Sequence, residues 1–374
     1  MQDISDPLLP WFFVRSAPGL GNHRFRRLWE AVGPPSAVLS SDAQTLREKA
    51  NLPEATISYL LGRKVPDDVK MDLDEARKAG ASVVTIADDC YPALLRQVPY
   101  PPPFLYVYGS LSASSRAVAL VGSRSPSGYG LDVSRRMARD LAAAGVTVVS
   151  GGARGIDTAA HEGALSGGGR TCAVLGCGLS LVYPAENRDL FEAVAQSGAV
   201  VSEFPMNAKP EAWRFPPRNR IISGMSAGVV VVEAAARSGS LITARLAGEQ
   251  NREVFAVPGS VTSLKSAGTH RLIRQGACLV ESAADILEVL EPLFGHLETA
   301  LGEPLPAPEP SMPPDLTQDE ALVYGALEAY PIHVDELCRK VGLSAGVLSG
   351  VLLSLELSGL VRQAPGKLFV RGER

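Results

Sequence analysis

The sequence predicts an α/β protein built around an extended Rossmann-like, doubly wound parallel sheet. A small helical N-terminal domain and a winged-helix C-terminal domain are expected to flank it. Three observations predict this class: helical segments fill the start of the chain, short Val-rich runs alternate with helices through its middle, and a proline-dense stretch precedes a last helical segment. Apolar strands separated by helices are typical of parallel sheets buried on both faces.

Residues 1–72 are predicted to form a compact helical domain. In "APGLGNHRFRRLWEAVG" a Pro-Gly-Leu-Gly turn precedes a helix with Phe25, Leu28 and Trp29 on one face. The turn resembles a helix-hairpin-helix or SAM-like arrangement, in which hairpin amides meet phosphate. One Gly-x-Gly is a weak signal, and a helical domain with an ordinary glycine turn is the favoured alternative.

Residues 73–296 are predicted to form the extended Rossmann-like domain. Helical segments such as 131–145 and 187–198 lie between its short apolar runs. The predicted strands are 117–122, 146–150, 171–176, 199–203, 228–233 and 253–258.

Residues 297–315 are predicted to be a linker, because "GEPLPAPEPSMPPD" (302–315) is too rich in proline to continue a helix. Residues 316–374 then predict a winged helix of three helices and a terminal β-hairpin, opened by a capping box between Thr317 and Glu320.

The second helix of this helix-turn-helix would normally read DNA. It offers Ser344, Ser349, Ser354 and Glu356, with no Lys or Arg. Docking to protein is therefore favoured over DNA reading for this module.

Composition limits the class of protein. No apolar run reaches the roughly 18 residues that a membrane span requires, and "MQDISDPLLPWFF" has no basic leader, so no span and no signal peptide are expected. The five cysteines include no CxxC pair, which favours reduced core residues in a cytoplasmic protein and no metal site.

Charge is distributed unevenly. The net charge is −4 and the pI about 5.8, which argues against general affinity for nucleic acid. Residues 208–275, however, contain ten basic and four acidic side chains, a local net charge of +6. A positive patch on an acidic protein indicates a specific anionic partner.

Four loops follow predicted strands, where ligands bind in open parallel sheets. Loop 122–130 exposes Ser123 and Arg124, loop 150–164 contains Gly151 and Gly152, loop 237–244 offers Ser240 as a helix N-cap, and loop 258–270 supplies Lys265. None matches G-x-G-x-x-G or the P-loop pattern, so no nucleotide cofactor is predicted. Several glycine loops at one edge favour an anion-binding crevice.

The stretch "WRFPPRNRIISG" (213–224) places two arginines at a predicted helix start, because proline suits the first helical positions. Arg218 and Arg220 are expected to converge there with Arg124 and Lys265 on phosphates, and Phe215 offers a flat surface for a base. Charge for the backbone and an aromatic ring for the bases predict single-stranded nucleic acid. The alternative is that the arginines pair with Glu211 on the surface and Phe215 is buried.

Acid–base catalysis is not indicated. Asp157 is expected in the first turn of a helix, where a carboxylate is favoured, and His161 and Glu162 lie on adjacent faces of that helix. These three residues are predicted to be structural.

The longer motifs resemble the DNA-processing protein A (DprA/Smf) family. They are "VGSRSPSGYG", "SGGARGIDTAAHEGAL", "YPAENRDLF", "SEFP", "FPPRNRIISGMS", "SGSLITARLAGEQNREVFAVPG" and "AGTHRLIRQGA", spread over about residues 117–277. Weaker likeness extends the resemblance to about residue 91.

The resemblance implies a non-enzymatic role in natural transformation (competence) and DNA recombination, in which homodimers coat and protect incoming single-stranded DNA and load the RecA recombinase. Matched motif by motif, it implies a DNA pocket of Arg124, Gly152, Phe215, Arg218, Asn219, Arg220 and Lys265.

Two other functions are compatible with parts of the sequence. Nucleotide phosphoribohydrolases resemble this fold but carry a catalytic Glu after a Pro-Gly-Gly-x-Gly-Thr stretch, where "ARSGSLITARLAGE" has Arg245 instead. A transcription factor reading duplex DNA through the winged helix is the other possibility.

Overall fold

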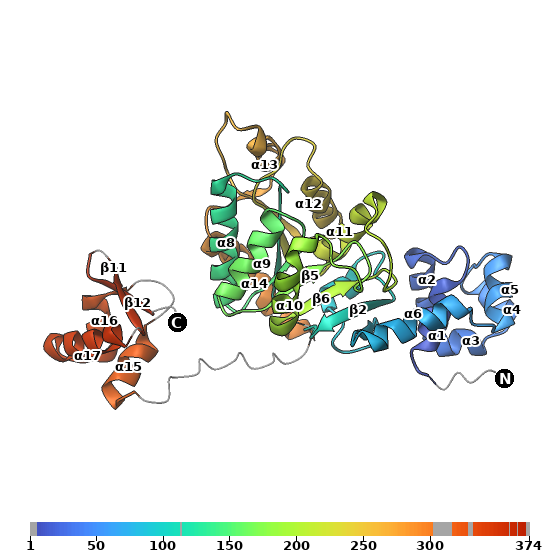
Figure 1. The fold of residues 1–374 in the computed structure, drawn as a ribbon, viewed down its shortest axis with the longest axis horizontal. Coiled ribbons are helices and arrows are strands. Elements are labelled where there is room, and N and C mark those ends of the chain that lie inside the picture. Colours follow the sequence, from blue (N-terminus) through green and yellow to red (C-terminus); the bar gives the residue numbers. More distant parts are fainter. Residues whose placement is uncertain are drawn as a thin grey trace. The chain divides into compact units, whose positions relative to one another are not determined.

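The computed structural model describes residues 6–112, 114–301, 316–327, 332–358, 360–364 and 366–371. The chain divides into two units, Met1–Glu303 and Pro304–Arg374. The first contains the helical region and the large sheet, and the second contains the predicted winged helix (Figure 1).

The helical region packs directly on one edge of the large sheet. Phe12 stacks on Phe104 with ring centroids 4.5 Å apart, and Asp72 accepts hydrogen bonds from the Tyr106 hydroxyl and from the Met206 amide (2.8 Å). Of the three residues predicted to share one helix face, Phe25 and Leu28 are buried and Trp29 is partly buried. The helices are α1 Leu9–Ser16, α2 Asn22–Val32, α3 Pro35–Ser40, α4 Ala43–Glu48, α5 Glu54–Gly62 and α6 Asp67–Lys78.

The nine-stranded sheet has the order β1-β2-β6-β5-β4-β3-β7-β8-β9. All six predicted strands are confirmed within a few residues. The strands are β1 Ser82–Thr85, β2 Phe104–Gly109, β3 Ala117–Val121, β4 Thr147–Ser150, β5 Thr171–Val174, β6 Ala199–Ser202, β7 Gly228–Val231, β8 Glu253–Ala256 and β9 Cys278–Leu279.

The expectation of a wholly parallel sheet needs correction at one edge. Strands β1 and β2 pair antiparallel with each other, and β2 pairs antiparallel with β6. The sequence does not predict these two strands, because β1 is short and β2 follows a run of prolines at 101–103. An antiparallel edge on an otherwise parallel sheet is common in this fold class.

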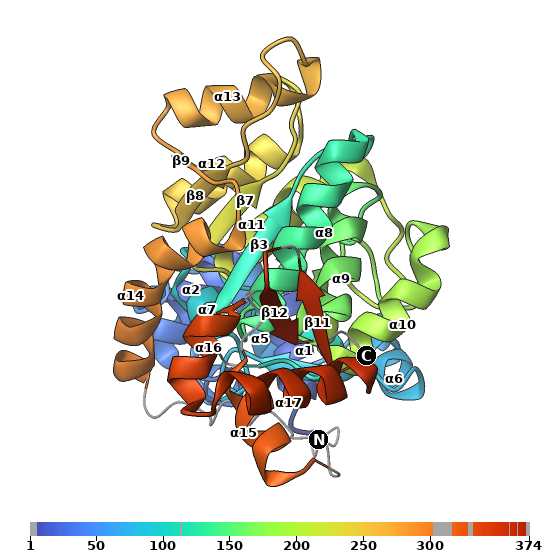
Figure 2. The same ribbon diagram turned by 90° about the vertical axis from the view of Figure 1, so that its left-hand side faces the viewer.

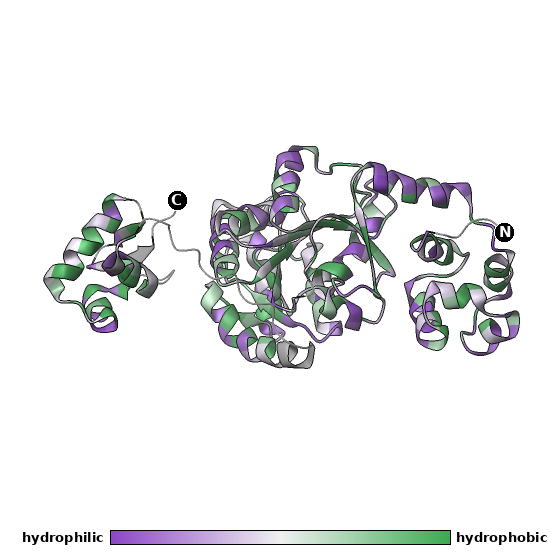
Figure 3. Cartoon of the chain, turned by 90° about the horizontal axis from the view of Figure 1, so that it is seen from below, coloured by the Kyte–Doolittle hydropathy of each residue, from purple (hydrophilic) through white to green (hydrophobic). Residues whose placement is uncertain are grey.

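Helices cover both faces of the sheet, as Figure 2 shows. Alternate residues of β3 enter opposite cores: Val118 and Leu120 pack with Met137 of α8, whereas Ala119 and Val121 belong to the core on the other face. The strands form the apolar centre of this unit (Figure 3). The helices are α7 Ala93–Gln97, α8 Gly128–Ala143, α9 Ile156–Ser166, η1 Ala185–Asn187, α10 Arg188–Ser197, η2 Ala212–Arg214, α11 Phe215–Gly224, α12 Ser240–Glu249, η3 Leu264–Ser266, α13 Ala267–Arg274 and α14 Ala283–Leu301.

Helix α14 extends past residue 297, where the linker was expected to begin. The proline-dense stretch 302–315 lies outside the described residues.

The described residues of the second unit form the three helices and the hairpin that the sequence predicts, with one further short strand. Thr317 and Glu320 form the expected capping box, and Leu337, Leu352 and Phe369 lie in the core. The elements are α15 Gln318–Ala326, β10 Ile332–His333, α16 Val334–Val341, α17 Ala345–Leu357, β11 Val361–Ala364 and β12 Leu368–Arg371.

Among the described residues, no single helix has the length and apolarity to cross a bilayer; only α16 and α17 together, bent by 107° at their junction, pass that test.

Candidate nucleic-acid interface

A pocket of about 810 Å³ opens at the carboxyl ends of β3 and β7. From β3 the sheet continues through β4 on one side, and from β7 through β8 on the other. This is the switch point at which open α/β sheets bind ligands. Its polar and aromatic lining includes Ser123, Arg124, Asp157, Tyr183, Phe215, Arg218, Asn219, Arg237 and Ser240.

Arg124 and Phe215 lie together on the pocket wall, as the sequence predicts. The exposed Arg124 guanidinium carbon is 5.2 Å from the centroid of the partly buried Phe215 ring. Tyr183 approaches the same ring, with centroids 6.0 Å apart and planes tilted by 41°. The alternative of a fully buried Phe215 is therefore wrong. The pocket combines an exposed cation with two aromatic rings, the groups that hold a phosphate and a stacked base.

Arg218 lies in the floor of the pocket rather than on its surface, with 4% of the residue exposed. Its Nη1 donates to the carbonyl oxygens of Gly151 (2.5 Å) and Val174, at the ends of β4 and β5. Burial lowers the pKa of Arg218 to about 10, an effect opposed by Asp157. A Cβ at residue 151 would lie 2.5 Å from Arg218 Nη1, so Gly151 is required by this close approach. Gly152 has a φ of +65°, which favours glycine.

Arg220 does not join this pocket, which corrects the expected convergence. Its Nη1 donates to the Tyr100 carbonyl (2.6 Å), and its Nη2 pairs with the Glu203 carboxylate. That side-chain pair is only 13% and 6% exposed. The ion pair with Glu211, which the alternative interpretation assigned to these arginines, is made by Arg214, whose Nη2 lies 3.0 Å from the Glu211 carboxylate. Arg220 is thus neutralised where the helical region meets the sheet domain.

Lys265 and Ser240 also differ from expectation. Lys265 lies on η3 beside Ser263 and Ser266, which line a separate pocket of about 470 Å³. Ser240 lines the main pocket, but it is the first residue of α12 and the N-cap is Gly239. The Ser240 side chain makes no capping hydrogen bond.

Arg237 and Tyr183 line the pocket but are absent from the predicted site. Arg237 is exposed near the end of the loop that joins β7 to α12, and Tyr183 is 44% exposed. Arg237 directly precedes the motif that begins at Ser238, and Tyr183 is the first residue of "YPAENRDLF". Their places in these motifs could have identified them from the sequence. Ser123 and Asn219 line the pocket as expected.

The three acid–base residues occupy different surroundings. His161 is fully buried beside Thr171, with Nδ1 2.7 Å from its hydroxyl, and burial lowers the pKa of His161 to about 3. Glu162 pairs with Arg135 at 2.9 Å. Asp157 is in the first turn of α9, as predicted, but it also lines the main pocket.

No group of three or more potential metal-ligating side chains occurs among the described residues. Cys172 and Cys177 are free and buried, and burial raises the pKa of their thiols to about 12 and about 11. Arg245, which replaces the acid of the enzyme pattern, lies 3.7 Å from Glu249 on α12.

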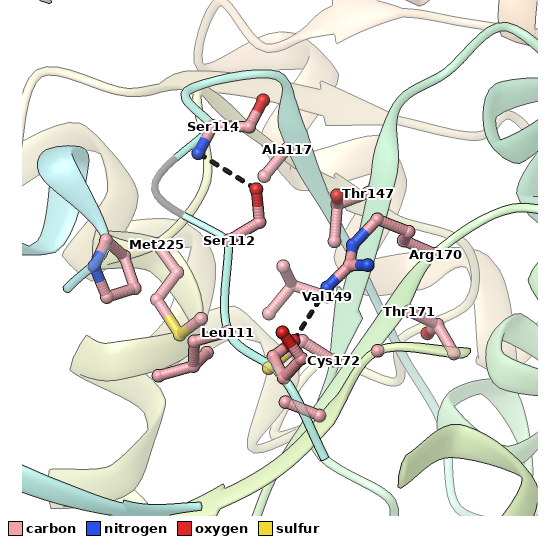
Figure 4. A pocket seen from close by; sticks show the side chains of 14 residues that line it. Leu111, Ser112, Ser114, Ala117, Thr147, Val149, Arg170, Thr171, Cys172 and Met225 are labelled. Carbon is pink, nitrogen blue, oxygen red and sulfur yellow. Dashed lines mark hydrogen bonds between the residues drawn. The ribbon is translucent and has the colours of Figure 1, made fainter. Parts of the chain in front are cut away.

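Figure 4 shows a pocket at the opposite, amino-terminal ends of the strands. Arg170 there donates to the Ser110 carbonyl (2.6 Å), and the Ser114 amide donates to Ser112. Its volume of about 20 Å³ is enough for one water molecule. It is too small to hold a nucleotide.

Two segments of the chain match known protein families. Residues 82–291 match the family described as DNA recombination-mediator protein A, and residues 306–367 match the DprA winged helix domain. Protein Smf of Synechocystis is 37% identical over 96% of this chain and 98% of its own length. Protein Smf of Escherichia coli is 46% identical over 74% of this chain and 73% of its own length.

Two solved structures share the fold. DNA processing protein A from Streptococcus pneumoniae has a TM-score of 0.64 at 34% identity, covering 75% of this chain and 97% of that one. DNA processing protein A from Helicobacter pylori, described for its single-stranded DNA binding mode, has a TM-score of 0.51 at 30% identity, covering 56% and 96%.

Proposed function

Because the chain belongs to the DNA recombination-mediator protein A family, we propose that it binds single-stranded DNA in the pocket at the ends of β3 and β7. The observation that carries this proposal is the meeting of Arg124 and Phe215 on one wall, with Arg237 on the same pocket. Guanidinium groups contact phosphates in any sequence, and an aromatic face stacks on any base.

The buried Arg218 supports this function indirectly. Its charge, held at the floor by two carbonyl oxygens, adds to the positive potential of the pocket. Arg220 has no part in the proposed contact, because Glu203 already neutralises it. Lys265 is left as a candidate for a phosphate further along the strand.

We further propose, from the family resemblance, that the protein is non-enzymatic and acts as a cytoplasmic homodimer. In this role it protects incoming single-stranded DNA during natural transformation and loads RecA onto it. The test is whether it speeds RecA assembly on strands already covered by single-strand binding protein. No acceleration would contradict RecA loading while leaving DNA binding intact.

Binding itself is tested by fluorescence anisotropy with single-stranded and duplex oligonucleotides over a range of salt concentrations. Replacing Arg124 and Arg237 with Ala should weaken binding to every single strand and flatten the salt slope by about 1.4, because each phosphate that is no longer neutralised accounts for roughly 0.7. The control replaces Arg47 and Arg245, two exposed arginines that pair with Glu54 and Glu249. Equal weakening in both double variants would show that net charge alone governs binding.

A further inference from the structure

An acidic side chain lines the pocket that is otherwise suited to an anion. Asp157 belongs to the lining together with Arg124 and Arg237, and 8% of it is exposed. A carboxylate beside a phosphate is repelled by it, so this part of the pocket is unsuited to the DNA backbone. A group that carries hydrogen-bond donors suits a carboxylate better.

The Asp157 carboxylate is not simply the direct partner of Arg218. The Arg218 guanidinium donates to the carbonyl oxygens of Gly151 and Val174, and its charge attracts the Asp157 carboxylate without a hydrogen bond between the two side chains among the described residues. Oδ2 of Asp157 accepts one long hydrogen bond, from the Ala153 amide at 3.3 Å. The Ser150 hydroxyl also lowers the pKa of this carboxylate, while donating to the Leu120 carbonyl at 2.6 Å. A carboxylate offers about four lone-pair sites, so Asp157 keeps acceptor capacity for a ligand.

Burial raises the pKa of Asp157, whereas Arg218, the Ala153 amide and Arg124 oppose the rise. The nearby guanidinium groups limit this rise, and a carboxylate in its ionised form accepts hydrogen bonds at both oxygens.

The distribution of charge orients a bound nucleotide. Arg124 and Arg237 are exposed on the pocket rim, whereas Asp157 and Arg218 are buried in its lining. A nucleotide whose phosphate meets the rim and whose base lies on Phe215 directs the edge of that base toward the buried groups. Single-stranded bases are read in this way, by stacking on the ring and hydrogen bonds to the Watson–Crick edge.

Base edges differ in what they offer a carboxylate. Guanine presents two adjacent donors, N1–H and the N2 amino group, which can reach both carboxylate oxygens. Adenine and cytosine present one amino group. Thymine presents N3–H between two carbonyl oxygens, which a carboxylate repels.

We propose that Asp157 accepts hydrogen bonds from the Watson–Crick edge of one inserted base, so that this subsite prefers guanine and disfavours thymine. The inference rests on the single-stranded DNA binding proposed above. It makes Asp157 a specificity-determining residue within an otherwise sequence-tolerant interface.

The test uses short oligothymidines that carry one variable nucleotide, with binding measured by fluorescence anisotropy. The wild-type protein should bind the oligonucleotide with dG about tenfold more tightly than the one with dT, the ratio expected from one hydrogen bond to a charged acceptor. Deoxyinosine lacks the N2 amino group and should lose most of this preference. Deoxy-7-deazaguanosine keeps the Watson–Crick edge and should retain it.

The matched variants are Asp157→Asn and Glu162→Gln, which remove one negative charge each from the same helix. Asp157→Asn should bring the dG-to-dT affinity ratio close to one, whereas Glu162→Gln should leave it unchanged. Loss of a charge alone would strengthen binding to all the oligonucleotides alike and preserve the ratio.

The deoxyinosine comparison needs no variant, so it decides the question even if Asp157→Asn fails to fold. Equal affinity of the wild-type protein for all of the oligonucleotides would overturn base recognition and leave the binding function standing. Failure to bind any of them would overturn the proposed function itself.

Discussion

Arg218 and Arg124 line one pocket, yet the structure predicts opposite consequences for their replacement. Changing Arg218 to Ala removes a guanidinium that is 4% exposed and leaves the buried carbonyl oxygens of Gly151 and Val174 without their donor. It also removes the stronger of the two guanidinium charges, Arg218 and Arg124, that oppose the rise in the pKa of the buried Asp157. Changing the exposed Arg124 to Ala removes a cation from one face of Phe215 and little packing.

The magnitude follows from these interactions. A hydrogen bond to a charged donor contributes about 1.5–3 kcal/mol, and Arg218 Nη1 makes two of them, to the carbonyl oxygens of Gly151 and Val174. Arg218→Ala should therefore lower the free energy of unfolding by about 3–5 kcal/mol, and the melting temperature of the sheet domain by about 10 °C. Arg124→Ala should leave the melting temperature nearly unchanged.

The assay pairs thermal unfolding, followed by circular dichroism, with the salt dependence of DNA binding. Arg124→Ala should flatten the salt slope by about 0.7. Arg218→Met keeps the length of the side chain without its charge and should still be destabilised. The reasoning fails if Arg218→Ala melts like the wild type and flattens the salt slope, because Arg218 would then be a phosphate ligand.

Three further predictions follow from particular residues. Arg220→Ala should lower the free energy of unfolding by about 3–5 kcal/mol, because it leaves the nearly buried Glu203 without its cation. Urea unfolding measures this loss, and anisotropy should show an unchanged salt slope of DNA binding. A flattened slope would place Arg220 on the DNA. Phe215→Ala should weaken binding of single strands by the roughly 1–3 kcal/mol of one stacked base while the salt slope stays the same; unchanged affinity would rule out stacking there. The pKa of His161 is about 3 in the folded chain, below its ordinary value of 6.5. Between these two values the unfolded chain binds one more proton than the folded chain. The free energy of unfolding should therefore be highest above about pH 6.5 and fall by about 1.4 kcal/mol per pH unit below it. Urea unfolding at pH 7 and pH 5 should show this decrease, and His161→Asn should lack its share of it; an equal decrease in the variant would assign the pH dependence to other groups.

The pattern of the sequence was sufficient for six of the nine strands of the sheet, β3 to β8, and for the general position of the site. Continuous apolar runs between helices define parallel strands whatever surrounds them, and the loops after β3, β4 and β7 then lie at one edge because parallel strands end together. The predicted Arg124 and Phe215 accordingly meet in the pocket.

Only the tertiary structure decided which charged groups face that pocket. Arg218 and Arg220 are two residues apart on α11, so they lie on different sides of the helix. That spacing is readable in the sequence, but the partners are not. Arg218 donates to the carbonyl oxygen at the end of β5, beneath the pocket. Arg220 pairs with Glu203, which precedes it by 17 residues in the sequence and which no local pattern links to it.

The same reason explains the other differences. Strands β1 and β2 are stabilised by pairing across the sheet edge and by packing against the N-terminal helices, not by local periodicity. Asp157 has the sequence position of a helix-start carboxylate and also a place in the pocket lining. Local sequence determines the form of each segment, whereas the side-chain environment depends on residues brought together from distant parts of the chain.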